Sequence, residues 1–214
     1  MCFSPEASFA GGLIISSIGV AALKQVHKPS QTVFASIPLL FGIQQIAEGI
    51  LWVALPRPDY VHARQFGMYA FLIMARVVWP MLMPLSVLLM EENRTRKKIL
   101  WILLAMGVSV SVYYVYCLLF LMVTPHIAGH HIQYTSDFPE SLAVPVFVLY
   151  FVAAITPLFI SSIKRTRLLG VLMFFSCLVT AIFFQLYITS VWCFFAAIIS
   201  VVVVWILRDS KKIT

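Results

Sequence analysis

The chain has 214 residues, of which 62% are hydrophobic and 11% charged, and its mean hydropathy is +0.98. An ordinary globular domain is roughly 45–50% apolar and about 25% charged. The charged residues are too few to cover the surface of a soluble domain. This composition therefore excludes a soluble enzyme, a disulfide-rich secreted domain and a disordered tail.

Seven segments are long and apolar enough to cross a bilayer as helices. Their connections are short, so neighbouring helices are expected to pack antiparallel in one domain. We therefore predict an all-α fold, in which residues 1–214 of a polytopic membrane protein form a single seven-helix transmembrane bundle. The expected spans are residues 7–23, 33–55, 66–90, 99–123, 142–163, 168–186 and 191–207.

The basic residues are distributed unevenly between the two ends of these spans. Of the 15 Lys and Arg residues, 12 fall in the first, third and fifth connections and in the C-terminal tail, whereas the opposite side has Arg57 and Arg64. Short loops rich in Lys and Arg remain in the cytoplasm. We expect the N-terminus outside and the C-terminus inside, in a multi-pass membrane protein. The net charge of +7 is then a topology signal, which indicates a lipid bilayer and no nucleic acid as partner.

In the first span, Ser8, Gly12 and Ser16 recur at every fourth residue. Small residues at this spacing let two helix backbones approach closely inside a membrane. We expect this face to pack against another helix.

The second and third spans each carry a charged residue, Glu48 and Arg76. A charge at the bilayer centre costs about 2.5–3.5 kcal/mol on insertion scales, so it normally faces a partner or water. At 1.5 Å per residue, both residues lie roughly 10–15 Å from the outer ends of antiparallel neighbours. A Glu48–Arg76 ion pair is therefore geometrically reasonable. Gln44 shares the helix face of Glu48, and Gln45 lies about 100° round the helix.

Prolines interrupt two of the spans. Pro80 and Pro84 lie in the third span, and Pro145 and Pro157 lie in the fifth. Each is expected to kink its helix. Neighbouring helices must then satisfy the freed carbonyl groups, as in a bundle with a polar interior.

Polar side chains also follow the fourth and sixth spans, where they fall at mid-membrane or in the outer half. The principal ones are Ser109, Tyr113, Tyr116, Ser176, Thr180 and Gln185. This distribution indicates a polar pocket that opens outward. The alternative is a set of hydrogen bonds between helices, each worth around 0.6 kcal/mol. The last span is apolar all round, and we expect it to face lipid.

The outer loop from Thr124 to Ser141 contains His126, His130 and His131 but no Lys or Arg. His126 and His130 are four residues apart, a spacing that suits a metal site on a helix. Gly129 and the lack of any apolar rhythm argue against a helix in this loop. A metal site at the three histidines is one hypothesis, and an outer loop that tolerates neutral His is the other.

The four cysteines are Cys2, Cys117, Cys177 and Cys193. Cys2 and Cys193 are both expected at the outer side, so a Cys2–Cys193 disulfide is possible in an oxidising environment, as is Cys2–Cys117. A buried free cysteine behaves as a small hydrophobic residue, which is the expectation for Cys177.

Two motifs carry a family resemblance: the opening MCFSPEASF and the second-span run IPLLFGIQQIAEG at residues 37–49. Together with Trp79-Pro80 in the third span, they resemble an uncharacterised family of small bacterial multi-helix membrane proteins. The resemblance implies that Cys2, Gln44, Gln45 and Glu48 belong to the characteristic pattern of that family. It carries over no activity.

The sequence identifies no cofactor. A retinal protein needs a Schiff-base lysine inside its last helix, and every lysine here lies in a segment expected in the cytoplasm, so retinal chemistry is excluded. Zinc hydrolases of the membrane ceramidase type bind zinc through histidines within their helices. Here the histidines lie in loops or at interfaces, which disfavours that class.

The leading hypothesis is a binding or transport-like protein that takes a small polar or amphiphilic ligand into the outward pocket. Glu48 and Arg76 would supply charge, and the other expected contacts are Gln44, Gln45, Tyr113, Tyr116, Gln185, Trp52 and Trp79. One alternative is a membrane-embedded enzyme acting on a lipid or isoprenoid at the outer face, with Glu48 as acid/base and the loop histidines on a metal. Another is a scaffold whose polar core only locks the helices together.

Overall fold

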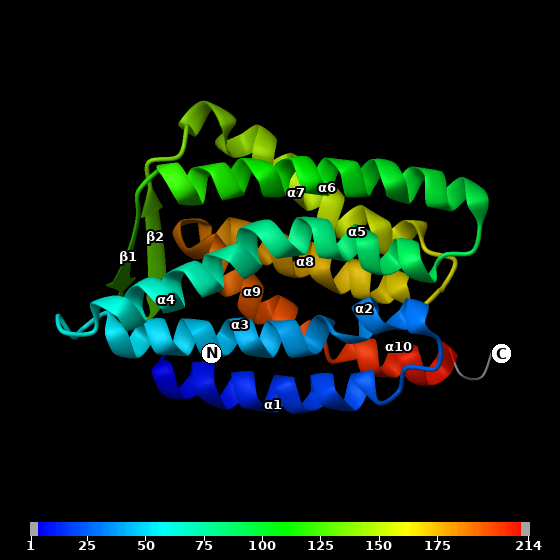
Figure 1. Cartoon of the computed structure of the whole chain (residues 1–214), viewed down its shortest axis with the longest axis horizontal. Coiled ribbons are helices and arrows are strands. Elements are labelled where there is room, and N and C mark those ends of the chain that lie inside the picture. The colour runs from blue at the N-terminus through cyan, green and yellow to red at the C-terminus, as the bar shows by residue number, and fades with distance from the viewer. Residues whose placement is uncertain (1–3, 211–214) are drawn as a thin grey trace.

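The computed structural model describes residues 4–210, in which seven helical spans are long and apolar enough to cross a membrane. They run along the long axis of the molecule (Figure 1). The predicted number of apolar spans is confirmed. The spans are α1 (Pro5–Leu23); η1, α2 and α3 (Pro29–Gln31, Thr32–Ala35, Ile37–Ala54); α4, η2 and α5 (Val61–Leu72, Ile73–Val78, Trp79–Met90); α6 (Arg94–Phe120); α7 (Glu140–Ile160); α8 (Thr166–Phe183); and η3, α9 and α10 (Gln185–Tyr187, Ile188–Ile199, Val202–Ser210).

Side-chain caps fix the beginnings of two helices. At α1, the Ser4 hydroxyl accepts a hydrogen bond from the Ala7 N–H at 3.2 Å, and Pro5 occupies the first position, where no N–H is needed. At α6, the Asn93 side chain accepts from the N–H groups of Thr95 and Arg96. These caps supply partners for backbone groups that have none inside their own helix.

Helices α1 and α3 lie in close contact through their small residues. A Cβ atom on Gly12 would lie 2.7 Å from Ile46 Cγ1 and 3.0 Å from the Gly42 carbonyl oxygen. A Cβ atom on Gly42 would lie 2.7 Å from the Ser16 backbone nitrogen. The predicted packing role of the first-span stripe is therefore confirmed, since larger side chains would push the two backbones apart.

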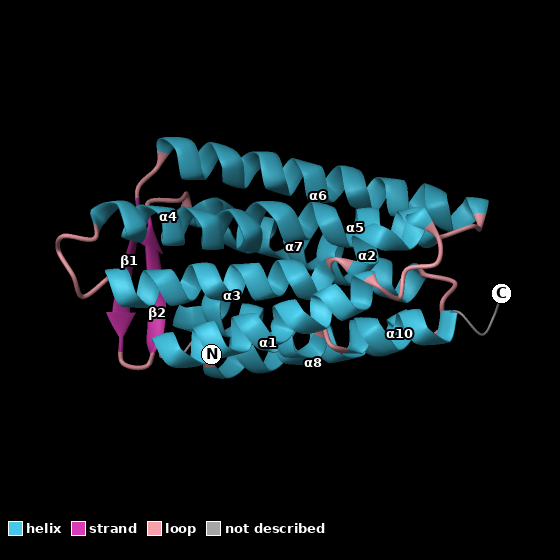
Figure 2. Ribbon diagram, turned by 60° about the horizontal axis from the view of Figure 1, so that its bottom comes forward, coloured by secondary structure: helices cyan, strands magenta, loops and turns pink. Residues whose placement is uncertain are grey.

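The connection between α6 and α7 forms an antiparallel hairpin of β1 (Val123–Ala128) and β2 (His131–Ser136), which was not predicted from the sequence. Gly129 begins the two-residue turn with a φ of 62°, a conformation that glycine adopts without a steric cost. The strands lie across the helix ends (Figure 2). The side chain of Ile132, in β2, is fully buried. The hairpin therefore covers one end of the bundle.

The last span packs one face into the bundle and leaves Ile198, Val201 and Trp205 exposed, so the prediction that all of it faces lipid was wrong for the packed face. Val191, Ala197 and Val203 are completely buried. Helix α9 contacts α3 and α8, and α10 contacts α1. An all-round apolar helix is compatible with either position, because lipid tails are as apolar as a protein interior.

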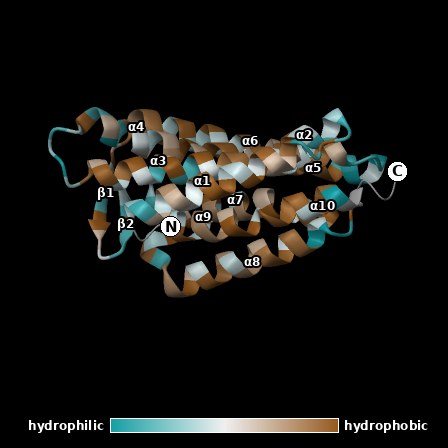
Figure 3. Cartoon of the chain, turned by 90° about the horizontal axis from the view of Figure 1, so that it is seen from below, coloured by the Kyte–Doolittle hydropathy of each residue, from teal (hydrophilic) through white to brown (hydrophobic). Residues whose placement is uncertain are grey.

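Hydrophilic segments gather at the two ends of the molecule (Figure 3). At the end opposite the hairpin, Glu91 is 2% exposed and joins the α5–α6 turn to the α7–α8 turn. Its carboxylate accepts hydrogen bonds from the Ser162 N–H at 2.7 Å and the Ser162 hydroxyl at 2.5 Å, and from the N–H groups of Glu92 and Asn93. Burial alone would raise the pKa of Glu91, but these hydrogen bonds together outweigh it and lower the pKa.

Candidate functional site

The third span changes its helical geometry around Arg76. Residues Ile73–Val78 form the π-helical segment η2, and the Trp79 N–H donates to the Met74 carbonyl five residues earlier. Pro80 follows at the start of α5 and has no N–H to donate. Such π segments occur frequently at functional sites.

Neighbouring helices satisfy carbonyl groups of η2. The Tyr150 hydroxyl of α7 donates to the Ala75 carbonyl at 2.7 Å, and the Ser111 hydroxyl of α6 donates to the Val77 carbonyl at 2.6 Å. Tyr150 and Ser111 therefore supply hydrogen bonds to the backbone next to Pro80. Together they hold the segment that carries Arg76.

The Arg76 guanidinium lies between two aromatic rings. Its central carbon is 5.4 Å from the centroid of the Tyr114 ring and 5.0 Å from that of Phe138. Both distances fall in the range of cation–π interactions. Among residues 4–208, no carboxylate lies within 4.0 Å of Arg76, so the Glu48–Arg76 ion pair inferred from the sequence is not formed.

Glu48 instead lies in a fully buried polar cluster between α3 and α9. Its carboxylate accepts a hydrogen bond from the Ser190 hydroxyl at 2.5 Å. One turn away, the Gln44 side-chain oxygen accepts from the Trp79 indole N–H at 2.7 Å, and the Trp79 ring stacks on Phe41. This cluster links the second, third and last spans, which explains why Glu48 and Arg76 need not pair.

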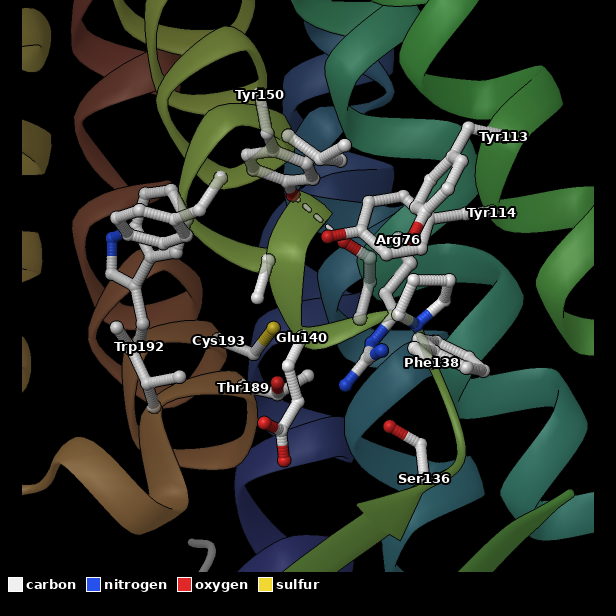
Figure 4. A pocket seen from close by; sticks show the side chains of 16 residues that line it. Arg76, Tyr113, Tyr114, Ser136, Phe138, Glu140, Tyr150, Thr189, Trp192 and Cys193 are labelled. Carbon is white, nitrogen blue, oxygen red and sulfur yellow. Dashed lines mark hydrogen bonds between the residues drawn. The ribbon is translucent and has the colours of Figure 1, made fainter. Parts of the chain in front are cut away.

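A cavity of about 330 Å³ lies beside η2, at the hairpin end of the bundle. Figure 4 shows Arg76, Glu140 and three tyrosines around it. Polar and aromatic groups from η2, α6, α7, α9 and the segment after β2 converge on this space. The lining residues are Ala75, Arg76, Tyr113, Tyr114, Ser136, Phe138, Pro139, Glu140, Ala143, Val146, Phe147, Tyr150, Ile188, Thr189, Trp192 and Cys193.

A much smaller void lies next to this cavity. A second void of about 20 Å³ adjoins it beyond Tyr150, Trp192 and Cys193, and Trp79 is among the apolar residues around that void. This volume is close to that of a single water-sized probe. The larger cavity is therefore a pocket at one end of the molecule.

The chain belongs to the family described as Family of unknown function (DUF6629). The match covers residues 1–214. Comparison with the curated proteins and with the solved structures finds no match. Membership agrees with the resemblance to an uncharacterised family, and the chemistry of this family member must be argued from its own residues.

The predicted site residues separate into three groups. Arg76 and Tyr113 line the cavity. The second group is buried and does not line it: Gln44, Gln45, Glu48, Trp52 and Trp79. Tyr116 is 58% exposed and Gln185 is exposed in η3, so neither contacts the cavity.

Sequence reasoning missed several lining residues, including Tyr114, Phe138, Tyr150 and Trp192. Tyr150 is the one tyrosine of the fifth span and lies in a long apolar stretch, and this was a usable signal. Phe138 gave none, because it reaches Arg76 only through the fold of the hairpin segment.

The hairpin separates the three histidines that were predicted as a metal site. His126 pairs with Gln133 across the strands, whereas the ring of His131 stacks on Tyr187 at 4.6 Å. Burial, and secondarily the charge of His130, lowers the pKa of His131. In the described part of the chain, no three His, Cys, Asp or Glu side chains are grouped to hold a metal. His126 lies in β1 and His130 in the turn, so the two do not share a helix face, in agreement with the expectation that this loop is not helical.

The predicted disulfides involve Cys2, which lies outside the described residues. Cys117, Cys177 and Cys193 are buried free thiols in the structure. Cys193 lines the cavity on α9. Each of these thiols packs as a small apolar group.

Proposed function

We propose that this protein is a membrane receptor or carrier that binds a small amphiphilic ligand in the cavity beside η2. The observation that supports the proposal is the convergence of one cation, several hydroxyl groups and an aromatic wall on a single cavity of about 330 Å³. Small-molecule sites are concave, mostly apolar and equipped with a few polar groups, with volumes of roughly 300–1,000 Å³. The cavity has these properties.

We further propose that the cavity faces outward in a bacterial cytoplasmic membrane. The hairpin end carries Arg57 and Arg64, whereas the connections at the opposite end contain the groups Lys24–Lys28, Arg94–Lys98 and Lys164–Arg167. Basic residues in short connections favour the cytoplasmic side. An outward cavity would receive its ligand from the outer leaflet or from the medium.

Cysteine labelling in intact cells tests this orientation. In a background with Cys2 replaced by Ser, we compare His130→Cys in the hairpin turn with Lys98→Cys near the start of α6. A membrane-impermeant maleimide should label the first variant in intact cells and the second only after lysis. The reverse pattern would overturn the outward orientation.

The enzyme hypothesis has less support from the geometry. It required Glu48 to contact a substrate, but Glu48 is fully buried and does not line the cavity. It also relied on histidines that lie apart on the hairpin. We therefore develop the binding function.

A blocking substitution tests the binding function. Ala143 lines the cavity on α7, whereas the adjacent Val144 is 72% exposed and does not line it. The probe is 8-bromo-1-octanol, whose bromine atom quenches the fluorescence of a tryptophan that it contacts. Bound in the cavity, it should quench Trp192.

The measurement uses the full chain in phosphatidylcholine nanodiscs, with Trp192→Phe to identify the contribution of Trp192. Ala143→Phe should abolish the saturable quenching of Trp192, and Val144→Phe should leave it intact. Saturable quenching that both variants retain, or that neither parent nor variants show, would refute the proposed function.

A further inference from the structure

The two charged residues of the cavity wall differ in their surroundings. Of the described residues that line the cavity, Arg76 and Glu140 carry charge. Arg76 is half-buried at membrane depth in the third span, whereas Glu140 is exposed in the first turn of α7. Figure 4 shows both side chains directed toward the same space. The cavity therefore has a cationic inner wall and an anionic group nearer to solvent.

The positive charge of Arg76 lacks an anionic partner within the described chain. No carboxylate approaches it within 4.0 Å, and Glu48, the acidic residue expected to pair with it, hydrogen-bonds to Ser190. The rings of Tyr114 and Phe138 attract the guanidinium through their faces. Neither ring carries a formal negative charge. An anion in the cavity would therefore be able to form an ion pair with the Arg76 guanidinium.

The geometry points to the ligand class: we propose that the cavity binds an amphiphile with a single negative charge, whose carboxylate or phosphate group pairs with Arg76. This inference rests on the proposed binding function. A guanidinium presents five N–H donors in a planar fork that matches the two oxygens of such a group. The π-helical backbone, held by Tyr150 and Ser111, keeps the Arg76 side chain at this wall.

The other residues of the cavity wall determine the properties of the uncharged part of the ligand. Trp192, Phe147 and Val146 offer apolar surface on α9 and α7. A cavity of about 330 Å³ is at the small end of ligand sites, so it accommodates a headgroup with a short apolar segment. Glu140 disfavours a second negative charge, because like charges repel. The ligand is therefore a monoanion with an apolar body.

The experiment compares two probes that differ in headgroup. In phosphatidylcholine nanodiscs, 8-bromooctanoate and 8-bromo-1-octanol are titrated against the quenching of Trp192. The carboxylate should bind about 10- to 100-fold more tightly, as expected for a hydrogen-bonded charge pair. Arg76→Gln should abolish this preference, and Arg76→Lys should retain part of it. Arg57→Gln, at the same end but outside the cavity, should leave it unchanged.

A second variant tests the charge without altering Arg76. Glu140→Gln removes the like charge and should raise the affinity for 8-bromooctanoate about two- to fivefold, with no change for 8-bromo-1-octanol. This variant keeps the inference testable if substitutions of Arg76 unfold the protein. A weakened binding of the carboxylate in Glu140→Gln would overturn the assignment of a monoanion.

The outcomes separate this inference from the function on which it rests. Equal affinity for the two probes, with quenching that Ala143→Phe abolishes, would overturn the anionic ligand and leave the binding function intact. Absence of any quenching sensitive to Ala143→Phe would overturn both. Inorganic phosphate separates the sources of the anion: competition as strong as that of octanoate would overturn the amphiphile and indicate a water-soluble anion.

Discussion

The phenolic oxygen of Tyr150 lies 2.7 Å from the carbonyl oxygen of Ala75. This hydrogen bond connects α7 to the π-helical segment that carries Arg76, across 75 residues of sequence. Both residues line the same cavity. The contact between α7 and η2 thus both stabilises the π-helical segment and forms part of the cavity wall.

Loss of the Tyr150 hydroxyl should weaken this connection. In Tyr150→Phe, the buried Ala75 carbonyl loses its side-chain donor, and we expect the free energy of unfolding to fall by about 1–3 kcal/mol. Thermal unfolding of the detergent-solubilised protein measures the effect. Tyr116→Phe is the matched control, because Tyr116 is 58% exposed. Equal midpoints for the two variants would contradict a structural role of the Tyr150 hydrogen bond.

Two adjacent glutamines should respond to the same substitution with opposite signs. Gln44 accepts the Trp79 indole N–H, so Gln44→Met leaves a buried donor unsatisfied and should cost about 1–3 kcal/mol of stability. Gln45 is fully buried, and among the described residues neither its side-chain oxygen nor its side-chain nitrogen has a hydrogen-bond partner. Gln45→Met should therefore raise the unfolding temperature, because an unpaired buried amide is unfavourable. A lowered temperature for Gln45→Met would show that this amide binds a water or another molecule.

The crossing of α5 and α6 should not tolerate a methyl group at Gly107. A Cβ atom there would overlap the Pro80 carbonyl oxygen and lie 2.8 Å from its carbon. The backbone cannot move aside as a side chain can, so Gly107→Ala should cost about 1–3 kcal/mol. In Gly49→Ala the new atom meets the Phe9 ring at 3.1 Å, and that ring can tilt. A smaller change in unfolding temperature is expected for Gly49→Ala, and the opposite order would refute the crossing geometry.

Glu91 should make stability depend on pH in the acidic range. Its folded-state pKa lies below the ordinary value of 4.5, so the unfolded chain binds the proton more readily. The stabilisation is present above about pH 4.5 and is lost as the pH falls through the folded-state pKa. Glu91→Gln should lower the free energy of unfolding at neutral pH by about 1.5–3 kcal/mol and flatten this acidic dependence.

The neighbouring Glu92 provides the control for that measurement. Its side chain is 89% exposed, and it pairs with Lys28 at 3.9 Å. Exposed ion pairs contribute about 0–1 kcal/mol. Glu92→Gln should therefore leave the pH profile of unfolding nearly unchanged, and a profile altered as much as in Glu91→Gln would contradict the special position of Glu91.

The sequence does not determine which polar side chains meet in the bundle. Glu48 and Arg76 lie at similar depths on neighbouring spans, and this local argument predicted an ion pair. The structure gives Glu48 a partner on α9, 142 residues away, and places Arg76 beside Phe138 of the hairpin segment. Spacing along one helix specifies a face, whereas the identity of the opposing helix depends on packing across the whole bundle.

Composition and periodicity by themselves determined the membrane class, the seven apolar spans and the close approach at Gly12. These features depend on hydrophobicity and side-chain size, which can be read from consecutive residues. Tertiary structure alone decided that the last span packs one face into the bundle, that the connection between α6 and α7 is a hairpin, and that Arg76 lines a cavity and does not pair with Glu48. Apolar side chains pack equally well against lipid or protein. The sequence of an apolar span therefore does not determine whether it contacts lipid or which helix it contacts.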